Sequence, residues 1–264
     1  MDLQLESKKA LVTGSTAGIG FAIAKALAKE GASVIVNGRT AARVEKALAS
    51  LRESGVRGNL SGLAADLGTA AGVKEAVQKF PDVDILVNNL GIFEAKPFER
   101  ITDEDWMHFF EVNVMSGVRL SRHYLPRMIE RGWGRIVFIS SESALQIPAE
   151  MIHYGMTKTA QLAVSRGLAE ITAGTNVTVN AILPGPTASE GVTDYLDSVA
   201  AMKKIDRAKI EREFVPNLRP TSLLRRLAEP DEVAAMVAFV CSPVSSATNG
   251  AALRVDGGVV RAIA

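Results

Sequence analysis

Two residues one helical turn apart carry the chemistry that this sequence suggests most clearly. Tyr154 and Lys158 are four positions apart, so a helix would place the phenol and the ammonium on one face. A free phenol has a pKa of about 10 and is a poor base at neutral pH, whereas a neighbouring cation lowers that pKa. The pair is therefore a candidate for proton transfer, although the same spacing also occurs in ordinary surface pairs.

A nearby serine strengthens the interpretation of this pair as a catalytic site. Ser141 lies thirteen residues before Tyr154, at the end of an apolar run that we predict to be a central strand. Its side chain would project from the carboxyl end of that strand. The adjacent Ser140 would point to the opposite side, because side chains alternate along a strand.

A glycine-rich turn at 13–20 directly follows the first predicted strand and opens the first predicted helix. Gly14, Gly18 and Gly20 would let the backbone approach a pyrophosphate, whose negative charge a helix N-terminus favours. A turn needed only for close helix–sheet packing could carry the same glycines. The position between a strand and a helix nevertheless favours dinucleotide binding.

The second predicted strand ends in Asn37-Gly38-Arg39, where NAD-binding chains place a carboxylate for the ribose. The sequence has a guanidinium there, and Arg39 suits a 2′-phosphate. We therefore expect NADP (NADPH) as the cofactor. The alternative is that Arg39 is an ordinary solvated arginine, since Ala17 adds no second basic group to the turn.

Short runs rich in Val and Ile alternate with helical patterns along the chain. We predict strands at 8–13, 33–37, 59–65, 83–87, 135–140, 177–182 and 251–255. We predict helices at 18–30, 40–53, 69–79, 103–130, 151–173 and 230–241. This alternation implies a parallel sheet with helices on both faces. The expected fold class is α/β, a doubly wound, Rossmann-type parallel sheet of seven strands.

The longest segment outside this alternation is 186–229, with short helical pieces at 190–204 and 206–214. Segments of this length inside a compact domain often act as lids. It leaves the carboxyl end of a strand, where ligands bind in open α/β sheets. No linker divides the chain, so we expect one domain over 1–264.

Composition argues against several other classes of protein. Thirty Lys and Arg residues against 29 Asp and Glu residues leave a net charge of +1, so we expect no nucleic-acid or membrane partner. The single cysteine, Cys241, cannot form an internal disulfide, which fits a cytoplasmic protein. The three histidines lack metal-ligand spacing with Cys, Asp or Glu, so we expect no metal site.

In order and spacing, these motifs resemble the short-chain dehydrogenase/reductase family, including members similar to 3-oxoacyl-[acyl-carrier-protein] reductase. The resemblance runs from about residue 6 to residue 258 and rests on Thr13 to Gly20, Asn88-Asn89-Leu90-Gly91, Asn113, Ser141, Tyr154, Lys158, Pro184-Gly185 and Val255-Asp256-Gly257-Gly258. It implies an NADP-dependent oxidoreductase that moves a hydride between the nicotinamide and a carbonyl or secondary alcohol. It also implies a homotetramer.

The resemblance implies a role for each matching residue. Tyr154 would be the general acid/base, and Lys158 would hold the nicotinamide ribose and lower the pKa of Tyr154. Ser141 would bind the substrate oxygen, and Asn113 would hold a water that relays protons to Lys158. The implied cofactor-binding residues are Gly14, Ser15, Thr16, Gly18, Ile19, Gly20, Arg39, Asp66, Leu67, Asn88, Gly91, Tyr154, Lys158, Pro184, Gly185 and Thr187.

The sequence leaves the substrate open beyond a small-molecule carbonyl or alcohol. A pocket walled by 93–98, 144–151 and 186–229 would be mainly apolar. The resemblance would allow an acyl-carrier thioester, but 169–176 lacks an obvious basic surface for the carrier. Whether such a thioester is used therefore stays open. The alternative function is a catalytically silent NADP(H)-binding regulatory or structural protein. Such a protein would be expected to lose Ser141, Tyr154 or Lys158, and all three are present.

Overall fold

The computed structural model describes residues 1–263, without the side chains at positions 194, 195, 198, 199, 203 and 211. The strands are β1 (Lys9–Val12), β2 (Ser33–Gly38), β3 (Leu60–Ala64), β4 (Ile85–Asn88), β5 (Gly134–Ile139), β6 (Val177–Pro184) and β7 (Ala252–Val255). Over the described residues they form one seven-stranded parallel sheet in the order β3-β2-β1-β4-β5-β6-β7. The predicted fold class is confirmed, and the order reverses between β1 and β4, where doubly wound sheets bind ligands.

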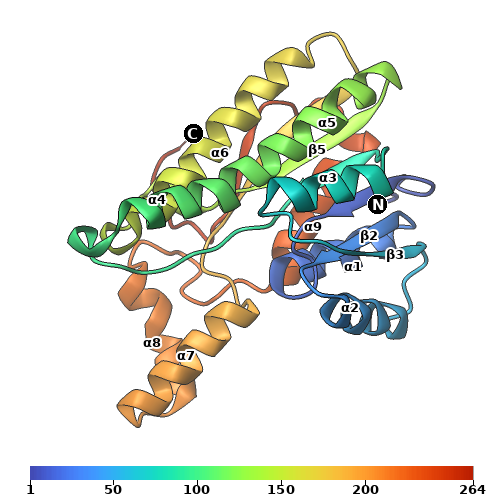
Figure 1. The fold of residues 1–264 in the computed structure, drawn as a ribbon. Helices are drawn as coiled ribbons and strands as arrows, with labels where there is room; N and C mark the ends of the chain where they lie inside the picture. Colours follow the sequence, from blue (N-terminus) through green and yellow to red (C-terminus); the bar gives the residue numbers. More distant parts are fainter. Residues whose placement is uncertain (264) are drawn as a thin grey trace.

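Helices cover both faces of this sheet (Figure 1). They are α1 (Gly18–Lys29), α2 (Ala41–Glu53), α3 (Ala70–Lys79), α4 (Asp103–Phe110), α5 (Ser116–Glu130), α6 (Ile152–Ile171), α7 (Glu190–Lys203), α8 (Arg207–Leu218) and α9 (Pro230–Cys241). Short helical turns are η1 (Phe98–Arg100), η2 (Glu111–Met115), η3 (Glu142–Ala144), η4 (Ala149–Met151) and η5 (Pro243–Ser245).

The two faces of the sheet belong to two separate hydrophobic cores. In β1, Ala10 and Val12 pack into the core that contains α1, α2 and α9. Leu11, which lies between them, packs into the core that contains residues of α3, α5 and α6. This alternation follows from the two-residue period of a strand. Because both faces are covered, the central strands consist of continuous apolar runs.

The predicted helix at 103–130 is interrupted. Its middle, η2, is a five-residue π-helical turn that joins α4 to α5. A π turn is rare and its hydrogen bonds are displaced from the α-helical pattern, so the apolar periodicity of the sequence does not reveal it. The piece predicted at 206–214 is also longer, because α8 continues through Pro216 to Leu218.

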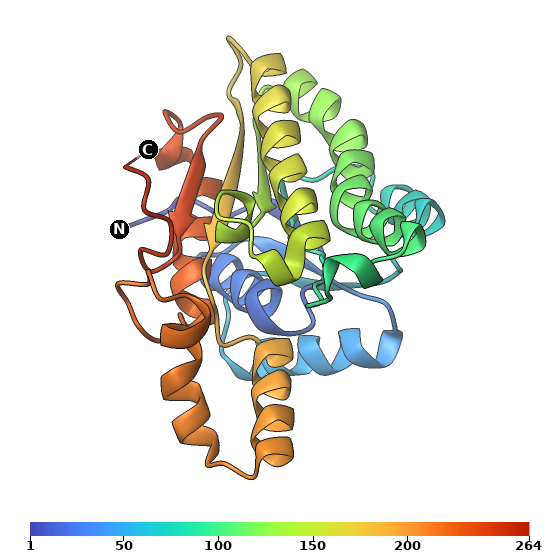
Figure 2. The ribbon, with the colours of Figure 1, turned by 90° about the vertical axis from the view of Figure 1, so that its left-hand side faces the viewer.

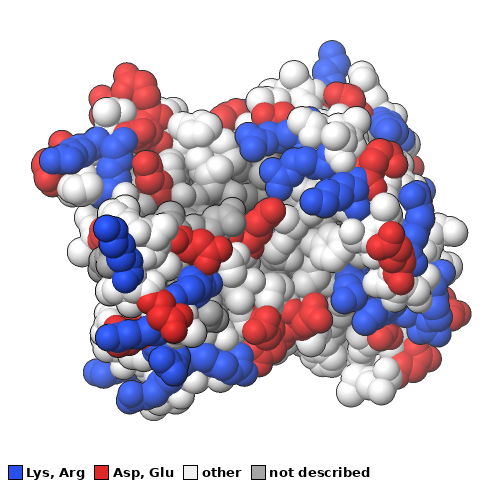
Figure 3. Space-filling model, turned by 90° about the horizontal axis from the view of Figure 1, so that it is seen from below, with Lys and Arg blue, Asp and Glu red and all other residues white. Residues whose placement is uncertain are grey.

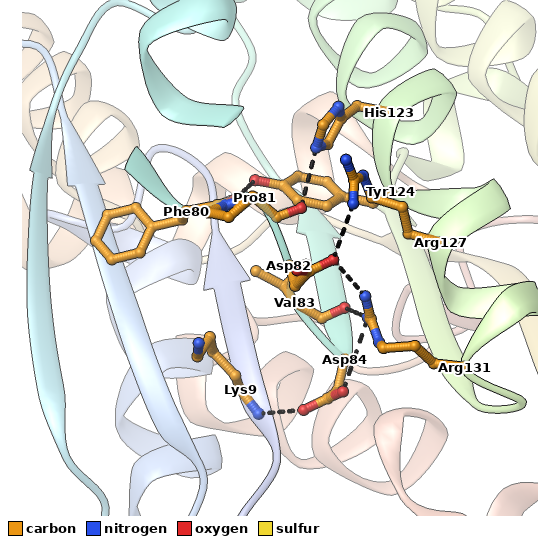
Figure 4. A network of polar contacts seen from close by, with 10 residues as sticks. All are labelled: Lys9, Phe80, Pro81, Asp82, Val83, Asp84, His123, Tyr124, Arg127 and Arg131. Carbon is orange, nitrogen blue, oxygen red and sulfur yellow. Dashed lines mark hydrogen bonds and ion pairs between the residues drawn. The ribbon is translucent and has the colours of Figure 1, made fainter. Parts of the chain in front are cut away.

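The C-terminal half of α5 is tied to the loop before β4 (Figure 4). The Tyr124 hydroxyl donates to the Phe80 carbonyl at 2.7 Å, and His123 Nε2 lies 3.0 Å from the Pro81 carbonyl oxygen. Arg131 Nη1 lies 2.6 Å from an Asp82 carboxylate oxygen. These contacts fix the start of β4, whose other end reaches the candidate site.

Two helices of the 186–229 segment stand apart from these layers. Figures 1 and 2 both show α7 and α8 side by side as a hairpin that projects from the body of the molecule. The hairpin has its own small core, formed by Leu196, Val215 and Leu227. It begins after β6, so its base lies at the carboxyl edge of the sheet.

Candidate active site

A cavity of about 600 Å³ opens at the carboxyl ends of β4, β5 and β6. The predicted wall regions 93–98, 144–151 and 186–229 each reach it only in part, and residues at or directly after the ends of β4, β5 and β6 line it as well. The lining residues are Ile19, Asn89, Gly91 to Ala95, Ile139 to Ser143, Glu150, Met151, Tyr154, Lys158, Pro184 to Thr187, Ser189, Val192, Phe214, Leu218 and Arg219.

The glycine-rich turn is shaped by neighbours on other strands. Gly14 and Gly18 have φ angles of 59° and 55°, in the left-handed region that favours glycine. Asn37, at the end of β2, accepts from the Gly14 N–H through Oδ1 at 3.0 Å and donates its own N–H to Ser15 Oγ at 2.9 Å. The Asn37 amide also donates to the Leu63 carbonyl at 3.1 Å, so β2 and β3 both hold the turn.

Gly20 allows a second set of contacts. A Cβ there would lie 2.4 Å from Asn89 Nδ2 and 2.5 Å from the Gly14 carbonyl oxygen, so a side chain does not fit. Asn89 Nδ2 donates to the carbonyls of Thr13 and Gly14 at 2.9 Å and 3.1 Å. The turn is therefore locked to the end of β4 by hydrogen bonds that need the close approach of α1.

The N-terminus of α1 fits the phosphates of a dinucleotide. The helices α2, α3 and α4 are capped by Thr40, Thr69 and Thr102, whereas the N-cap of α1 is Ala17, which has no side-chain hydrogen bond. The first turn of α1 also contains no acidic residue. Its N–H groups thus keep hydrogen-bonding capacity, and the helix dipole favours an anion there.

Four of the predicted cofactor-binding residues, Thr16, Arg39, Asp66 and Leu67, lie toward the β2–β3 side of the same edge and do not line the cavity. Arg39 is exposed just beyond β2, and Thr16 packs against Gly38. Asp66 is exposed, with Oδ1 accepting from the Gly68 N–H at 3.0 Å, whereas Leu67 is buried.

The remaining predicted cofactor residues approach or line the cavity. Asn88 is buried at the end of β4, with Nδ2 donating to Ser121 Oγ at 3.3 Å. Gly185 has no room for a side chain, because a Cβ would lie 2.6 Å from the Asp256 carbonyl oxygen. Thr187 Oγ1 donates to the Gly185 carbonyl at 2.9 Å. Ile19, Gly91, Pro184 and Gly185 also line the cavity.

Ser141 and Tyr154 meet at the end of β5. The Ser141 hydroxyl donates to Glu142 Oε2 at 2.5 Å and accepts from the Ser143 N–H at 3.1 Å. Ser140, by contrast, donates to the Lys158 backbone carbonyl at 2.9 Å and so ties α6 to β5. Phe93 packs edge-on against the Tyr154 ring, with 6.4 Å between the ring centroids.

Glu142 joins this site to the 186–229 segment. Arg219, at the end of α8, donates through Nε to Glu142 Oε1 at 2.9 Å, and its Nη1 lies 3.5 Å from Glu150 Oε1. Both Glu142 and Arg219 are buried. A chain of contacts therefore runs from Arg219 through Glu142 to the Ser141 hydroxyl.

The surroundings of Tyr154 keep its phenol protonated. Burial is the main cause of its raised pKa, and the negative charge of Glu142 adds to it. A hydrogen bond with Ser141 and the charge of Arg219 act in the opposite direction, and they are outweighed. Burial therefore outweighs the lowering that a neighbouring cation gives, and the role of Lys158 in lowering this pKa stays a prediction. A protonated phenol is suited to donating a proton.

Lys158 is buried on α6, with its Nζ 5.6 Å from the centre of the Tyr154 ring. The ammonium donates to the Ile139 carbonyl at 2.9 Å and to Gln161 Oε1 at 3.3 Å. Burial lowers the pKa of Lys158 to about 8. The pair therefore lies on one helical face, as its spacing predicts.

Asn113 is placed by η2 and does not line the cavity. Its side chain accepts from the Ile92 N–H at 2.8 Å and donates to the Ile92 carbonyl at 3.0 Å and to Thr157 Oγ1 at 2.9 Å. Its backbone carbonyl accepts from Gln161 Nε2 at 2.6 Å. The amide thus connects the chain after Gly91 to α6 by hydrogen bonds. The predicted water relay stays a prediction.

Four residues of this arrangement were not predicted from the sequence: Asn37, Glu142, Gln161 and Arg219. A clue exists for Glu142, because a carboxylate directly after a strand-end serine has to lie near the site. Gln161 is seven residues after Tyr154, about two helical turns, and so shares its side of the helix. Arg219 carries no such clue, since its place depends on how α8 folds back.

The chain is similar in sequence and fold to several known proteins. A family model described as short chain dehydrogenase matches residues 8–200. An uncharacterized oxidoreductase of Bacillus subtilis, YvaG, is 52% identical over 263 residues, which cover 100% of both chains. D-beta-hydroxybutyrate dehydrogenase of Cupriavidus necator is 35% identical over 97% of this chain and 99% of its own. The structure of L-sorbose reductase from Gluconobacter frateurii, complexed with NADPH and L-sorbose, is 32% identical, covers 100% of both chains and has a TM-score of 0.93.

The buried pair between Arg219 and Glu142 leads to a stability prediction. Replacing Arg219 with Met should lower the free energy of unfolding by about 3–5 kcal/mol, because it leaves the Glu142 carboxylate buried without its partner. The matched control is Arg226→Met, since the Arg226–Glu232 pair at 2.8 Å is largely exposed and should contribute much less to stability. Denaturant unfolding at neutral pH measures both, and equal losses would contradict the assignment.

Proposed function

The chain belongs to the short-chain dehydrogenase family, and from this premise we propose that it is an NADPH-dependent reductase of neutral carbonyl compounds. Its class, an oxidoreductase acting on alcohol or carbonyl groups, follows from that membership. The direction and the cofactor are our proposal. One observation carries it: Ser141, Tyr154 and Lys158 line the same cavity, where a carbonyl oxygen can meet both hydroxyl groups. The raised pKa of Tyr154 agrees with a role as proton donor.

In this proposal each residue around the cavity has a separate role in the reaction. Ser141 donates a hydrogen bond to the substrate carbonyl oxygen and turns away from Glu142 to do so. Tyr154 gives its phenolic proton to that oxygen as negative charge develops on it. When bound, the cofactor supplies the hydride. The α1 N-terminus, Gly91 and the segment 184–187 would hold this cofactor. The Lys158 ammonium favours the phenolate that remains after this transfer. The hydrogen bond to the Ile139 carbonyl orients the ammonium.

Two basic side chains support the choice of NADP. Arg39 is exposed beyond β2, and Arg43, on the first turn of α2, adds a second guanidinium that the glycine-rich turn itself lacks. Arg43 Nη2 lies 3.3 Å from Glu190 Oε2 on α7, in an exposed pair that contributes little and is easily exchanged for a phosphate contact. The L-sorbose reductase structure was solved with NADPH, which supports the same choice.

The charges around the cavity favour a neutral substrate. Glu94, Glu142 and Glu150 line it, against the two cations Arg219 and Lys158. A carboxylate substrate would therefore meet an excess of negative charge at short range. Figure 3 shows the face toward which α7 and α8 project, where side chains of both signs surround a pale hollow. Such a mixture does not steer one sign of charge toward the site.

The homotetramer implied by the family resemblance remains a proposal. So do the single domain over 1–264 and the cytoplasmic location, which were predicted from the sequence itself. In Figures 1 and 2 the helices α5 and α6 lie side by side on one face, and both are long enough for a helical subunit interface. Within residues 1–263, the structure contains no helix that is long and apolar enough to cross a membrane.

The proposed activity is tested with ketones that differ mainly in one substituent. With NADPH, we expect propiophenone and 2-hydroxyacetophenone to be reduced with kcat/KM about tenfold or more above that of phenylglyoxylate, because only the last is an anion. NADPH oxidation followed by absorbance measures all three, together with neutral aliphatic and cyclic ketones. A preference for phenylglyoxylate would contradict the neutral substrate class.

The control variant is Tyr154→Phe, which removes the proton donor and keeps the ring. It should lower kcat by about 10²–10⁴-fold and leave NADPH binding intact. If the unaltered protein and the variant both bind NADPH and are equally inert with every ketone, the enzyme proposal fails. The catalytically silent alternative would then hold.

Cofactor choice has a separate test. Arg39→Ala should lower kcat/KM for NADPH by about 10–100-fold and change the value for NADH little, since a charged hydrogen bond to the 2′-phosphate is lost. Arg52→Ala, which removes an exposed arginine from the last turn of α2, is the control for the change in net charge. Equal losses for both cofactors in Arg39→Ala would exclude Arg39 from 2′-phosphate binding.

A further inference from the structure

A buried amide connects two residues of the proton-transfer site. Gln161 lies on α6 and is only 2% exposed. Its Nε2 donates to the Asn113 carbonyl at 2.6 Å, and its Oε1 accepts from Lys158 Nζ at 3.3 Å. Both ends of the carboxamide are thus engaged, one with a backbone oxygen and one with the ammonium.

The contacts of Lys158 show what this connection does. An ammonium has three N–H donors arranged as a tripod. One donates to the Ile139 carbonyl of β5 and one to Gln161, which leaves one for the cavity that Lys158 lines. The direction of the last N–H is therefore set by the other two contacts.

The orientation of Gln161 is fixed in turn by η2. The displaced hydrogen bonds of a π turn let a backbone carbonyl accept from outside its own helix, and the Asn113 carbonyl accepts from Gln161. That hydrogen bond decides which end of the carboxamide faces the lysine, because the amide nitrogen is turned to Asn113. Only the oxygen is then left for the ammonium.

We propose that Gln161 is a positioning residue: anchored on the Asn113 carbonyl, its carboxamide oxygen holds the Lys158 ammonium and aims the remaining N–H into the cavity beside Tyr154. The proposal rests on the proposed function only for its effect on catalysis. The contact itself can be tested in the protein without any substrate.

The groups that face the ammonium are few and mostly neutral. Tyr154 is the titratable group on α6 itself, one turn earlier. The Ile139 carbonyl faces it from β5, and Asn113 and Gly91 lie close to it from η2 and from the turn after β4. Burial is the cause of the lowered pKa of Lys158, and an acceptor oxygen opposes that effect because it stabilises the charged form.

The test follows the ionisation of Lys158 directly. In protein labelled with ¹³C at lysine Cε, the signal missing from Lys158→Met identifies this residue, and its chemical shift is followed against pH. In the unaltered protein it should titrate at about 8. In Gln161→Met, which keeps the length and apolar volume of the side chain, it should titrate about one unit lower, because one acceptor is lost.

Two further variants sharpen this result. Gln161→Asn keeps a buried amide but is one methylene too short to span both partners, so it should show the same downward shift. Ser165→Ala, one turn further along α6 at another buried polar position, should leave the titration unchanged. With the ketone that is reduced fastest, kcat should fall about tenfold in both Gln161 variants and not in Ser165→Ala.

The outcomes separate this inference from the proposed function. Folded Gln161 variants in which Lys158 titrates as in the unaltered protein would overturn the inference, even if their activity falls, since that pattern indicates a merely structural role. A downward shift together with an unaltered protein that reduces no ketone would leave the positioning contact standing and would count against the proposed reductase.

Discussion

The site depends on one unfavourable arrangement: an ammonium kept inside the protein. Removing Lys158 from water costs free energy, and its lowered pKa shows that burial, not a partner charge, dominates its surroundings. The cost is reduced by neutral oxygens supplied by β5 and by Gln161. The Gln161 oxygen is held in place by the hydrogen bond from Gln161 Nε2 to the Asn113 carbonyl, so the π turn between β4 and β5 supports the lysine. Local strain or irregularity of this kind is typical of functional sites.

On the opposite side of the cavity, a buried carboxylate connects the residues of the site. Glu142 accepts the Ser141 hydroxyl, raises the pKa of Tyr154 and binds Arg219 of the 186–229 segment. A change in the position of α8 would therefore reach the serine through two hydrogen bonds. It would also alter the charge that keeps the tyrosine protonated. The Arg219–Glu142 pair therefore connects the 186–229 segment to the Ser141 hydroxyl.

Much of this structure can be predicted from the sequence, because local rules determine it. The two-residue period of the strands, the glycine turn after β1 and the spacing of Tyr154 and Lys158 each depend on neighbours in the chain. Other features depend on tertiary packing: η2 breaks the helix predicted at 103–130 without any change in apolar pattern, and α8 runs past a proline. Glu142, Arg219 and Gln161 become parts of the site only when β5, α8 and α6 meet. The raised pKa of Tyr154 was missed for the same reason, since burial is not visible in the spacing of a pair.

Burial and the charge of Glu142 hold Tyr154 as a neutral proton donor. The phenolate absorbance in the near ultraviolet tests this most directly, as a difference titration between the unaltered protein and Tyr154→Phe. We expect the phenolate of Tyr154 to be absent up to the ordinary value of about pH 10 and to form only above it. A phenolate that forms at about pH 7, in the range of a general base poised for neutral pH, would show instead that burial does not control this tyrosine.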